Sequence, residues 1–329
     1  MAKHSVTNRH LVADIGGTNT RIAQAEGSVL ISGTMERFRN NEYSCFDNVL
    51  RAYLATHTGV RFESLCFALA GPVWNGCGTL TNLNWKIDTR RICEDFGIRE
   101  AFLLNDLEVQ GHAIDHLEHE AISTIFPSQR GNAAINRNSA KLVVGLGTGF
   151  NTATVQETKS GPLILSSESG HMGLNLTTPT ARALIQHLEK DINFVACEDV
   201  LSGRGIERVF QWLSNGVRTA PILSAPEIVL AADNGDEKAK ETIRSVCKIL
   251  GATVGDLALT HLPFGGIFLV GSVARALSPY LAEMGFDECF RAKGRFSDFM
   301  DEFSVSVMDD DFAGLKGCAV FLGQSQGRA

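Results

Sequence analysis

Two glycine-rich turns contain the residue types that bind anions. They are "DIGGTNT", beginning at Asp14, and "GLGTGFN", beginning at Gly145. Glycine has no Cβ, so its backbone N–H can approach an anion closely, and a threonine hydroxyl adds a further donor. We therefore expect both turns to bind phosphate. The candidate donors are Gly16, Gly17, Thr18 and Asn19 in the first turn and Gly147, Thr148 and Gly149 in the second.

Neither turn has the pattern of a common nucleotide-binding loop. A P-loop needs GxxxxGK[ST], and no lysine follows closely after either turn, nor does either fit GxGxxG. Two such turns suit an extended polyphosphate, with a metal ion supplying the charge that a lysine would otherwise give. Asp14 is placed to bind Mg²⁺ through water, because Mg²⁺ keeps most of its hydration shell. The alternative for Asp14 is a carboxylate that caps the turn.

A third candidate is the carboxylate in "LLNDLEV". Asp106 lies where an apolar run ends and a helical pattern begins. The carboxyl ends of strands are where open α/β sheets bind ligands, which favours a functional role. The alternative is a helix N-cap, since Asn-Asp before a helix is good capping chemistry.

Strands alternating with helices must position these residues, and this alternation predicts an α/β fold. The two turns each join two strands, so we expect two α/β units that open alike. The strands are expected at 10–17, 20–27, 28–38, 64–73, 100–105, 265–271 and 302–308. The helices are expected at 45–59, at 89–97 with Thr89 as N-cap and Gly97 as the stop, and at 106–114, 178–191, 205–213, 236–262 and 314–324.

The bulk composition describes an ordinary globular protein large enough for two domains. The chain has 329 residues, of which 44% are hydrophobic and 20% charged. Its net charge of −7 argues against nucleic acid or an anionic membrane as the main partner. The eight cysteines form no CxxC pair, so we expect reduced, mostly buried thiols. The polar start "MAKHSVTNRH" and the lack of a long apolar run make a cytoplasmic protein the expectation.

Ten segments together resemble the bacterial glucokinases, hexokinase-type enzymes within the superfamily of sugar kinases, Hsp70 and actin. In chain order they are "DIGGTNTR", "AGPV", "LTNLNW", "LLNDLEV", "GLGTG", "ESGHMG", "ACEDVLSGRGIERV", "GGIFLVGSVA", "KGRF" and "DFAGLKGCA". Each alone is weak evidence, but their shared order spans essentially the whole chain.

This resemblance implies a role for each candidate. Asp106 would be the general base that accepts the proton of the sugar 6-hydroxyl. The residues matching the family's sugar-binding positions are Asn105, Asp106, Glu168, His171 and Glu198. Asn82 either lines the same pocket or has a turn role. Glu168 and His171 could instead bind a metal, but no third ligand is spaced to join them. ATP would be bound by Ala13, Asp14, Ile15, Gly16, Gly17, Thr18, Asn19, Gly147, Thr148, Gly149 and Gly271.

Several positions depart from the family pattern, and they lie near the expected ligands. Where glucokinases usually have "GEGGH", this chain has "SESGH", with Ser167 and Ser169 in place of glycines. Phe150-Asn151 replaces Leu-Gly after the second turn, Ser272 replaces a glycine, and Gly173 replaces an Asp. These changes bear on which hexose fits more than on the reaction.

The resemblance also implies a whole-molecule arrangement and a reaction. The fold would be two actin-like (ribonuclease H-like) α/β domains facing across a ligand cleft. The small domain would be residues 1–118 plus about 313–329, and the large one 119–312. The expected reaction is phosphorylation of glucose to glucose 6-phosphate by ATP with Mg²⁺, in a homodimer. The alternatives are a kinase for another hexose or amino sugar, and a sugar-binding regulatory protein with little turnover.

Overall fold

A computed structural model describes residues 9–80, 83–129, 139–174, 178–214 and 223–326. The chain forms two compact units, which we call unit 1 and unit 2. Unit 1 comprises Met1–Leu117 and Asp310–Ala329, and unit 2 comprises Glu118–Asp309. The chain therefore leaves unit 1 once and returns to it at its C-terminal end.

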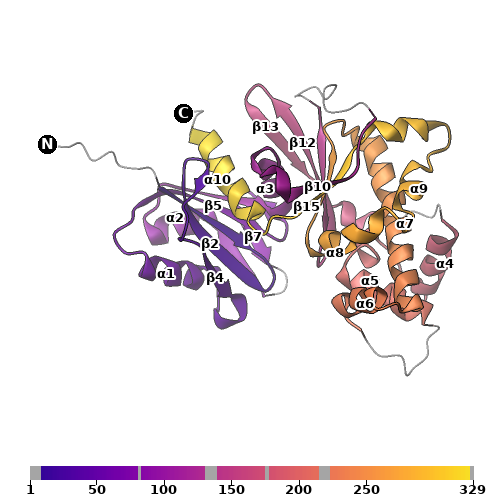
Figure 1. Ribbon diagram of the computed structural model, residues 1–329. Helices are drawn as coiled ribbons and strands as arrows, with labels where there is room; N and C mark the ends of the chain where they lie inside the picture. The colour runs from indigo at the N-terminus through magenta and orange to yellow at the C-terminus, as the bar shows by residue number, and fades with distance from the viewer. Residues whose placement is uncertain (1–8, 81–82, 130–138, 175–177, 215–222, 327–329) are drawn as a thin grey trace. The chain divides into compact units, whose positions relative to one another are not determined.

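Unit 1 is built on a sheet with strand order β3-β2-β1-β5-β9, in which β4 also pairs with β2 (Figure 1). The hairpin of β1 and β2 is antiparallel, whereas β1, β5 and β9 run parallel. A small second sheet has the order β6-β7-β8. The strands of unit 1 are β1 Arg9–Ile15, β2 Asn19–Glu26, β3 Val29–Leu30, β4 Glu36–Arg39, β5 Phe62–Leu69, β6 Val73–Trp74, β7 Cys77–Leu80, β8 Trp85–Asp88 and β9 Glu100–Asn105.

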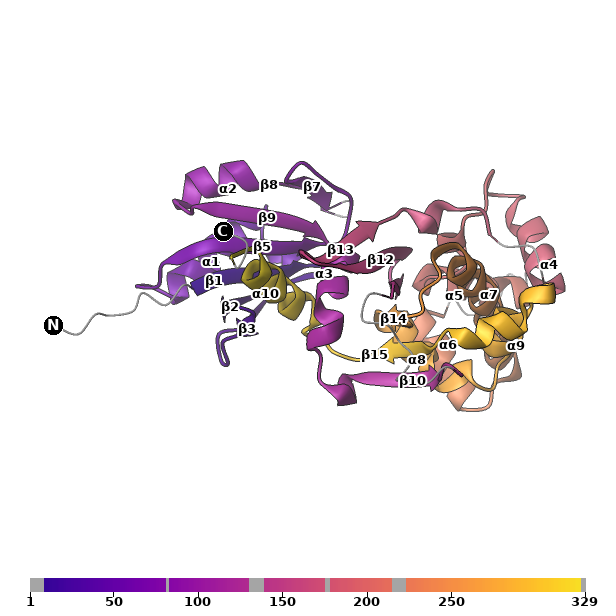
Figure 2. The same ribbon diagram turned by 90° about the horizontal axis from the view of Figure 1, so that it is seen from above.

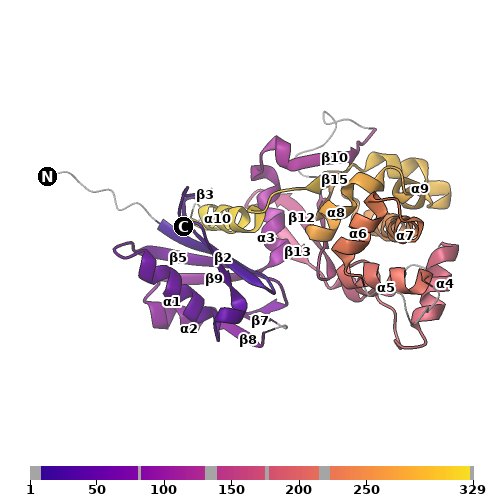
Figure 3. The same ribbon diagram turned by 60° about the horizontal axis from the view of Figure 1, so that its bottom comes forward.

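Helices cover both faces of this sheet (Figure 3). The helices of unit 1 are α1 Phe46–Thr56, α2 Thr89–Phe96, α3 Asp106–Ala113 and α10 Ala313–Gln326, with short 3₁₀ turns at Asn40–Glu42 and Ile114–His116. On one face, α1 and α2 pack on side chains such as Leu11 and Phe67. On the other face, α3 and α10 pack on side chains such as Val12 and Cys66. The strand side chains alternate between these two cores, as a sheet buried on both faces requires.

Unit 2 has one mixed sheet of order β10-β15-β14-β11-β12-β13. Its strands are β10 Ile122–Phe126, β11 Lys141–Leu146, β12 Phe150–Thr158, β13 Gly161–Ser166, β14 Ile267–Val270 and β15 Val305–Met308. The strands β11, β14 and β15 run parallel, and β11 forms an antiparallel hairpin with β12 across the second glycine turn.

The helices of unit 2 pack around α7, a helix of 25 residues. They are α4 Pro179–Leu188, α5 Gly203–Leu213, α6 Ala225–Asp233, α7 Glu237–His261, α8 Ser272–Leu281 and α9 Phe286–Arg291, with 3₁₀ turns at His119–Ala121, Ser169–His171, Cys197–Asp199, Gly294–Phe296 and Asp298–Glu302. Figure 2 shows α5 and α9 beside α7, and their buried apolar side chains share one core with β11, β14 and β15.

Most of the predicted elements are confirmed, and two local predictions are wrong. The expected strand at 28–38 is interrupted: β3 and β4 pair separately with β2. The N-cap of α2 is Asp88, whose carboxylate accepts the N–H of Arg90, and Thr89 is already helical. Gly97 ends this helix in the left-handed region at φ 64°, as predicted.

The structure gives the state of each cysteine and the length and apolar content of each described helix. All eight thiols are free, and five of them are buried. Across the described residues, no helix combines the length and apolar content needed to cross a bilayer.

Candidate functional site

The first glycine turn and Asp106 follow two parallel strands of unit 1, β1 and β9, which lie on either side of β5. Ile15 at the end of β1 pairs with Leu69 at the end of β5, and Leu69 pairs with Asn105 at the end of β9. Gly16 and Asp106 are the next residues along their strands. The turn and the carboxylate therefore leave the same edge of one sheet, at the carboxyl ends of its parallel strands.

The first turn is held by hydrogen bonds that leave donors free. The N–H of Gly16 donates to the Asn19 carbonyl at 3.0 Å. Buried Asn40 binds the turn twice, donating from its backbone N–H to Thr18 O at 2.9 Å and from its side chain to Gly16 O at 2.7 Å. Among the described residues, the N–H groups of Gly17 and Thr18 have no hydrogen-bond partner. A rigid turn with free N–H groups is what an anion-binding turn requires.

The two strand residues that flank Asp14 differ from it in burial. Ala13 and Ile15 are fully buried in the core that α1 and α2 cover. Of the β1 residues predicted to bind nucleotide, only Asp14 is partly exposed.

Asp14 lies at the end of β1, close to the start of α10. A carboxylate oxygen is 3.8 Å from the Arg21 guanidinium, which also donates to the Asp311 carbonyl. A Cβ added at Gly314 would be 3.0 Å from Asp14 Cγ, so the helix start approaches the carboxylate closely. Burial raises the pKa of Asp14, and the charge of Arg21 opposes this shift.

The metal-binding potential of the chain rests on isolated carboxylates. Within the described segments, no group of three or more His, Cys, Asp or Glu side chains is arranged to hold a metal ion. A single carboxylate such as Asp14 fits a Mg²⁺ ion that takes its remaining ligands from water and substrate phosphates.

Asn105 and Asp106 have separate structural roles at the start of α3. Asn105 is the N-cap: its Oδ1 accepts the Leu107 N–H at 3.0 Å, and its Nδ2 donates to Gly71 O at 3.2 Å. Asp106 is the first helical residue, and its Oδ1 also accepts the Leu107 N–H at 3.0 Å. Asn105 therefore holds the N-cap position, and Asp106 shares the Leu107 N–H with it as the first helical residue.

The second turn leaves the corresponding edge of the sheet in unit 2. Gly145 in β11 pairs with Val270, the last residue of β14, so the turn and Gly271 begin side by side. The N–H of Gly147 donates to Gly149 O at 2.9 Å. Gly271 has φ 103°, and a Cβ there would be 2.3 Å from Leu146 O, so only glycine fits. Thr148 lies at the tip of the turn and is exposed.

Glu198 lies against the second turn. Its Oε2 accepts the Phe150 N–H at 3.3 Å, and its Oε1 is 3.3 Å from Arg204. A Cβ at Gly149 would be 2.3 Å from Oε2, so a larger residue at this position would displace the carboxylate.

Glu168 and His171 lie on a segment that contacts both β12 and the Glu198 segment. Glu168 accepts a hydrogen bond from Asn151 Nδ2 at 3.1 Å, and His171 is exposed. An isolated bridge joins Gly173 to Ala196, and the Cys197 N–H donates to Met172 O at 2.8 Å. Unit 2 thus brings together Glu168, His171, Glu198 and the second turn. Asn82, the remaining candidate, lies outside the described residues.

Comparisons with known proteins place the chain in a family. A family model described as Glucokinase matches residues 11–325. The chain belongs to the glucokinase family. A glucokinase from Mesorhizobium japonicum is 30% identical over 318 residues, covering 94% of this chain and 90% of that protein.

Solved glucokinases have the same fold. The crystal structure of a glucokinase from an Antarctic psychrotroph matches with a TM-score of 0.83 and 31% identity, over 96% of this chain and 98% of that one. A ROK-family glucokinase from Streptomyces griseus, solved with glucose and AMPPNP, matches at 0.64 and 16% identity, over 95% and 99%. The predicted α/β fold with actin-like domains is confirmed.

Three residues of this glucokinase-family chain have roles that sequence reasoning missed. Arg21 pairs with Asp14, Arg204 pairs with Glu198, and Asn151 binds Glu168. Asn151 stood out in the sequence only as a departure from the family pattern. Strand register and loop contacts create these pairs, and spacing along the chain does not reveal them.

Proposed function

We propose that this chain is an ATP-dependent glucokinase, which transfers the γ-phosphoryl group of ATP to the 6-hydroxyl of glucose. Its membership of the glucokinase family supports the reaction. The observation that carries the mechanism is the register of β1, β5 and β9, which sets the first glycine turn and Asp106 at one sheet edge.

Asp106 is the proposed general base. Phosphoryl transfer to a hydroxyl needs an aligned nucleophile, neutralised phosphate charge and an acceptor for the departing proton. The carboxylate of Asp106 would accept that proton and direct the 6-hydroxyl oxygen. Capping by Asn105 fixes the start of α3 and so fixes where Asp106 lies.

The sugar hydroxyls would bind to Asn105, Glu168, His171 and Glu198. Carboxylates that accept hydroxyl hydrogen bonds reject analogues lacking those hydroxyls, because the carboxylate is then left unpaired. Contacts with Phe150 and Asn151 keep Glu198 and Glu168 in defined positions. The role proposed for Asn82 rests on sequence alone.

The phosphates would bind to the two turns and to Mg²⁺. The free N–H groups of Gly17 and Thr18 suit one end of the phosphate chain, and the 147–149 turn suits another part. Asp14 would hold Mg²⁺ through water, and Mg²⁺ when bound neutralises phosphate charge. The nucleoside would lie near Gly271.

ADP release across a panel of hexoses and amino sugars tests the reaction. We expect turnover on glucose, and we expect Asp106→Asn to lower kcat by about 10²–10⁴ while sugar binding is largely kept. The control is Asp95→Asn, which removes a carboxylate 42% exposed on α2. Absence of turnover above the Asp106→Asn rate on every sugar would overturn the kinase assignment in favour of a sugar-binding regulator.

A kinase for another hexose is the second candidate. It is favoured by the hydrogen-bonded cluster of Asn151, Ser167 and Ser169 around Glu168, where the family usually has glycines. The same panel decides: a sugar that exceeds glucose tenfold in kcat/KM replaces glucose as the substrate.

We also propose the cellular setting that such an enzyme would have. It would act in the cytoplasm at the first step of glycolysis, as a homodimer, and its two units would be its two domains. These proposals rest on the family resemblance, and sedimentation of the purified chain tests the dimer.

A further inference from the structure

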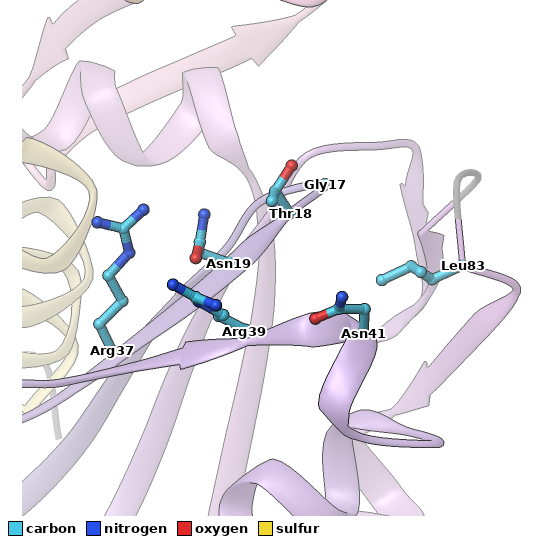
Figure 4. A pocket seen from close by; sticks show the side chains of 7 residues that line it. All are labelled: Gly17, Thr18, Asn19, Arg37, Arg39, Asn41 and Leu83. Atoms are coloured by element: carbon cyan, nitrogen blue, oxygen red, sulfur yellow. The ribbon is translucent and has the colours of Figure 1, made fainter.

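A pocket of unit 1 contains two arginines that the proposed reaction does not use. It has a volume of about 430 Å³. Its lining residues are Gly17, Thr18, Asn19, Arg37, Arg39, Asn41 and Leu83 (Figure 4). The lining includes no carboxylate, and it includes two guanidinium groups and two side-chain amides.

Strand register turns both arginines toward the first glycine turn. In the pairing of β2 with β4, Asn19 is opposite Arg39 and Arg21 is opposite Arg37. Opposite residues of an antiparallel pair project to the same face, with their Cβ atoms about 4.5–5.5 Å apart. Phe38, between the two arginines, points to the other face and packs on the core there. Figure 4 shows Arg37 and Arg39 on the side of β4 from which Asn19 also projects.

The charges of both arginines are unneutralised within the described part of the chain. Neither guanidinium has a hydrogen bond or an ion pair there. Arg21, on the same face, differs, because it contacts Asp14 at 3.8 Å and donates to Asp311 O at 2.9 Å. Two exposed guanidinium groups with no counter-charge attract an anion, and the planar fork of arginine matches a phosphate group.

The remaining donors of the pocket are fixed in place. The free N–H groups of Gly17 and Thr18 belong to the turn that Asn40 holds with two hydrogen bonds. Asn40 also accepts the Thr20 hydroxyl at 2.8 Å, and Asn41 of the pocket is the next residue. The turn and the 3₁₀ segment carrying Asn41 are thus one preorganised structure beside the two arginines.

We propose that Arg37 and Arg39 form a phosphoryl-binding subsite with the first glycine turn. In the proposed kinase reaction, on which this inference rests, the group bound is a phosphate of the donor chain or the phosphate ester of the sugar product. Both sources present the same chemistry: a tetrahedral dianion that accepts hydrogen bonds from guanidinium and backbone N–H groups.

Calorimetric titration of the full chain with tripolyphosphate, and separately with glucose 6-phosphate, tests this subsite. In the double variant Arg37→Gln/Arg39→Gln we expect the Kd of at least one of these anions to rise at least tenfold. The Kd of Arg39→Lys should lie between those of the wild type and the double variant, because lysine keeps the positive charge but lacks the planar donor fork of arginine. The matched control is Arg61→Gln, which removes an exposed arginine of the same unit outside the pocket and should leave Kd unchanged. Thermal melting should show that all three variants fold.

The two anions distinguish the source of the phosphoryl group. If Kd changes for tripolyphosphate and KM rises for ATP with little change for glucose, the subsite binds the donor. If only the Kd of glucose 6-phosphate changes, it binds the product ester. If the wild-type chain binds neither anion, or binds both as tightly in the double variant, the inference is wrong. Arginine-dependent binding in a chain without kinase activity would keep this inference and refute the proposed function.

Discussion

At the scale of single residues, Asp14 combines two demands that oppose each other. It is the proposed contact to a hydrated Mg²⁺ ion, which needs a charged carboxylate. Burial nevertheless raises its pKa, with Arg21 opposing. Keeping this carboxylate ionised therefore lowers the stability of the folded protein, a cost that is common at functional sites.

Asp14→Asn should stabilise the fold and lower activity. The wild-type carboxyl has a higher pKa in the folded chain than its ordinary value of 3.8. Binding of a proton to Asp14 therefore favours the folded state. This contribution to stability is complete below about pH 3.8 and is lost as pH rises through the folded-state pKa. We expect the variant's gain in Tm over wild type to grow as pH rises above about 4, and kcat/KM for MgATP to fall about tenfold or more.

Thermal melts across this pH range and steady-state kinetics measure both effects. Asp95→Asn is the control, because it removes an exposed carboxylate and should show neither. A pH-independent Tm difference, or a variant less stable at high pH, would contradict the argument from burial.

At the scale of elements, β12 and the 3₁₀ turn Ser169–His171 are joined through the side chains of Asn151 and Thr152. Asn151 accepts the Ser169 N–H at 2.9 Å and donates to Glu168 at 3.1 Å. Thr152 adds hydroxyl contacts to Ser167 at 2.8 Å and to Ser169 at 2.9 Å. Three of the residues that depart from the family pattern, Asn151, Ser167 and Ser169, are therefore hydrogen-bonded to one another. We infer that they position Glu168.

Asn151→Ala should raise KM for the sugar about 2–12-fold with little change in kcat, the range expected from one neutral hydrogen bond. The reason is that Glu168 loses its partner while the reacting groups stay in place. Thr158→Ala, at the far end of β12, is the control, since the hydroxyl it removes binds only within the β12–β13 turn, donating to Gly161 O and accepting the Ser160 N–H. An unchanged KM with an altered melting temperature would show that Asn151 has a structural role alone.

Elements with a strong local signal could be predicted from the sequence. The long helix was expected at 236–262, and α7 runs Glu237–His261 with Asp236 as its N-cap, because its capping residue and apolar spacing agree. The β1–β2 hairpin was also predicted, because two short apolar runs flank the first glycine turn. In contrast, β10 was missed: its residues are half-exposed or exposed, so no apolar run marks it. Short α9 and edge strands such as β3 also depend on tertiary partners.

The candidate site shows the same limit. The glycine turns and Asp106 are local features, and the sequence pointed to them. Arg37 and Arg39 sit on either side of Phe38, so their shared face could have been read from strand alternation. Their position beside Asn19 could not, because it depends on the register of β4 against β2.

At the scale of the whole molecule, the C-terminal helix α10 packs in the same unit as the N-terminal strands. Helix α10 packs on β1, β5 and α3, and its Leu315, Cys318 and Leu322 are buried in the same cluster as Val12 and Cys66. One face of the unit 1 sheet is therefore buried by α10. Close packing marks this interface: a Cβ at Gly317 would be 2.0 Å from Val109 O, so α10 meets α3 backbone to backbone.

Gly317→Ala should destabilise unit 1 selectively, by about 1–3 kcal/mol or more, because an added methyl group has no room against a backbone atom. Hydrogen exchange resolves the two units separately, which a single melting curve does not. We expect faster exchange in β1, β5 and β9, and unchanged protection in β11 and β14. Ser325→Ala is the matched control on the same helix, since its hydroxyl binds only Phe321 O within α10. Equal loss of protection in both units would mean that they unfold as one, and no loss in either would mean that α10 does not hold unit 1 together.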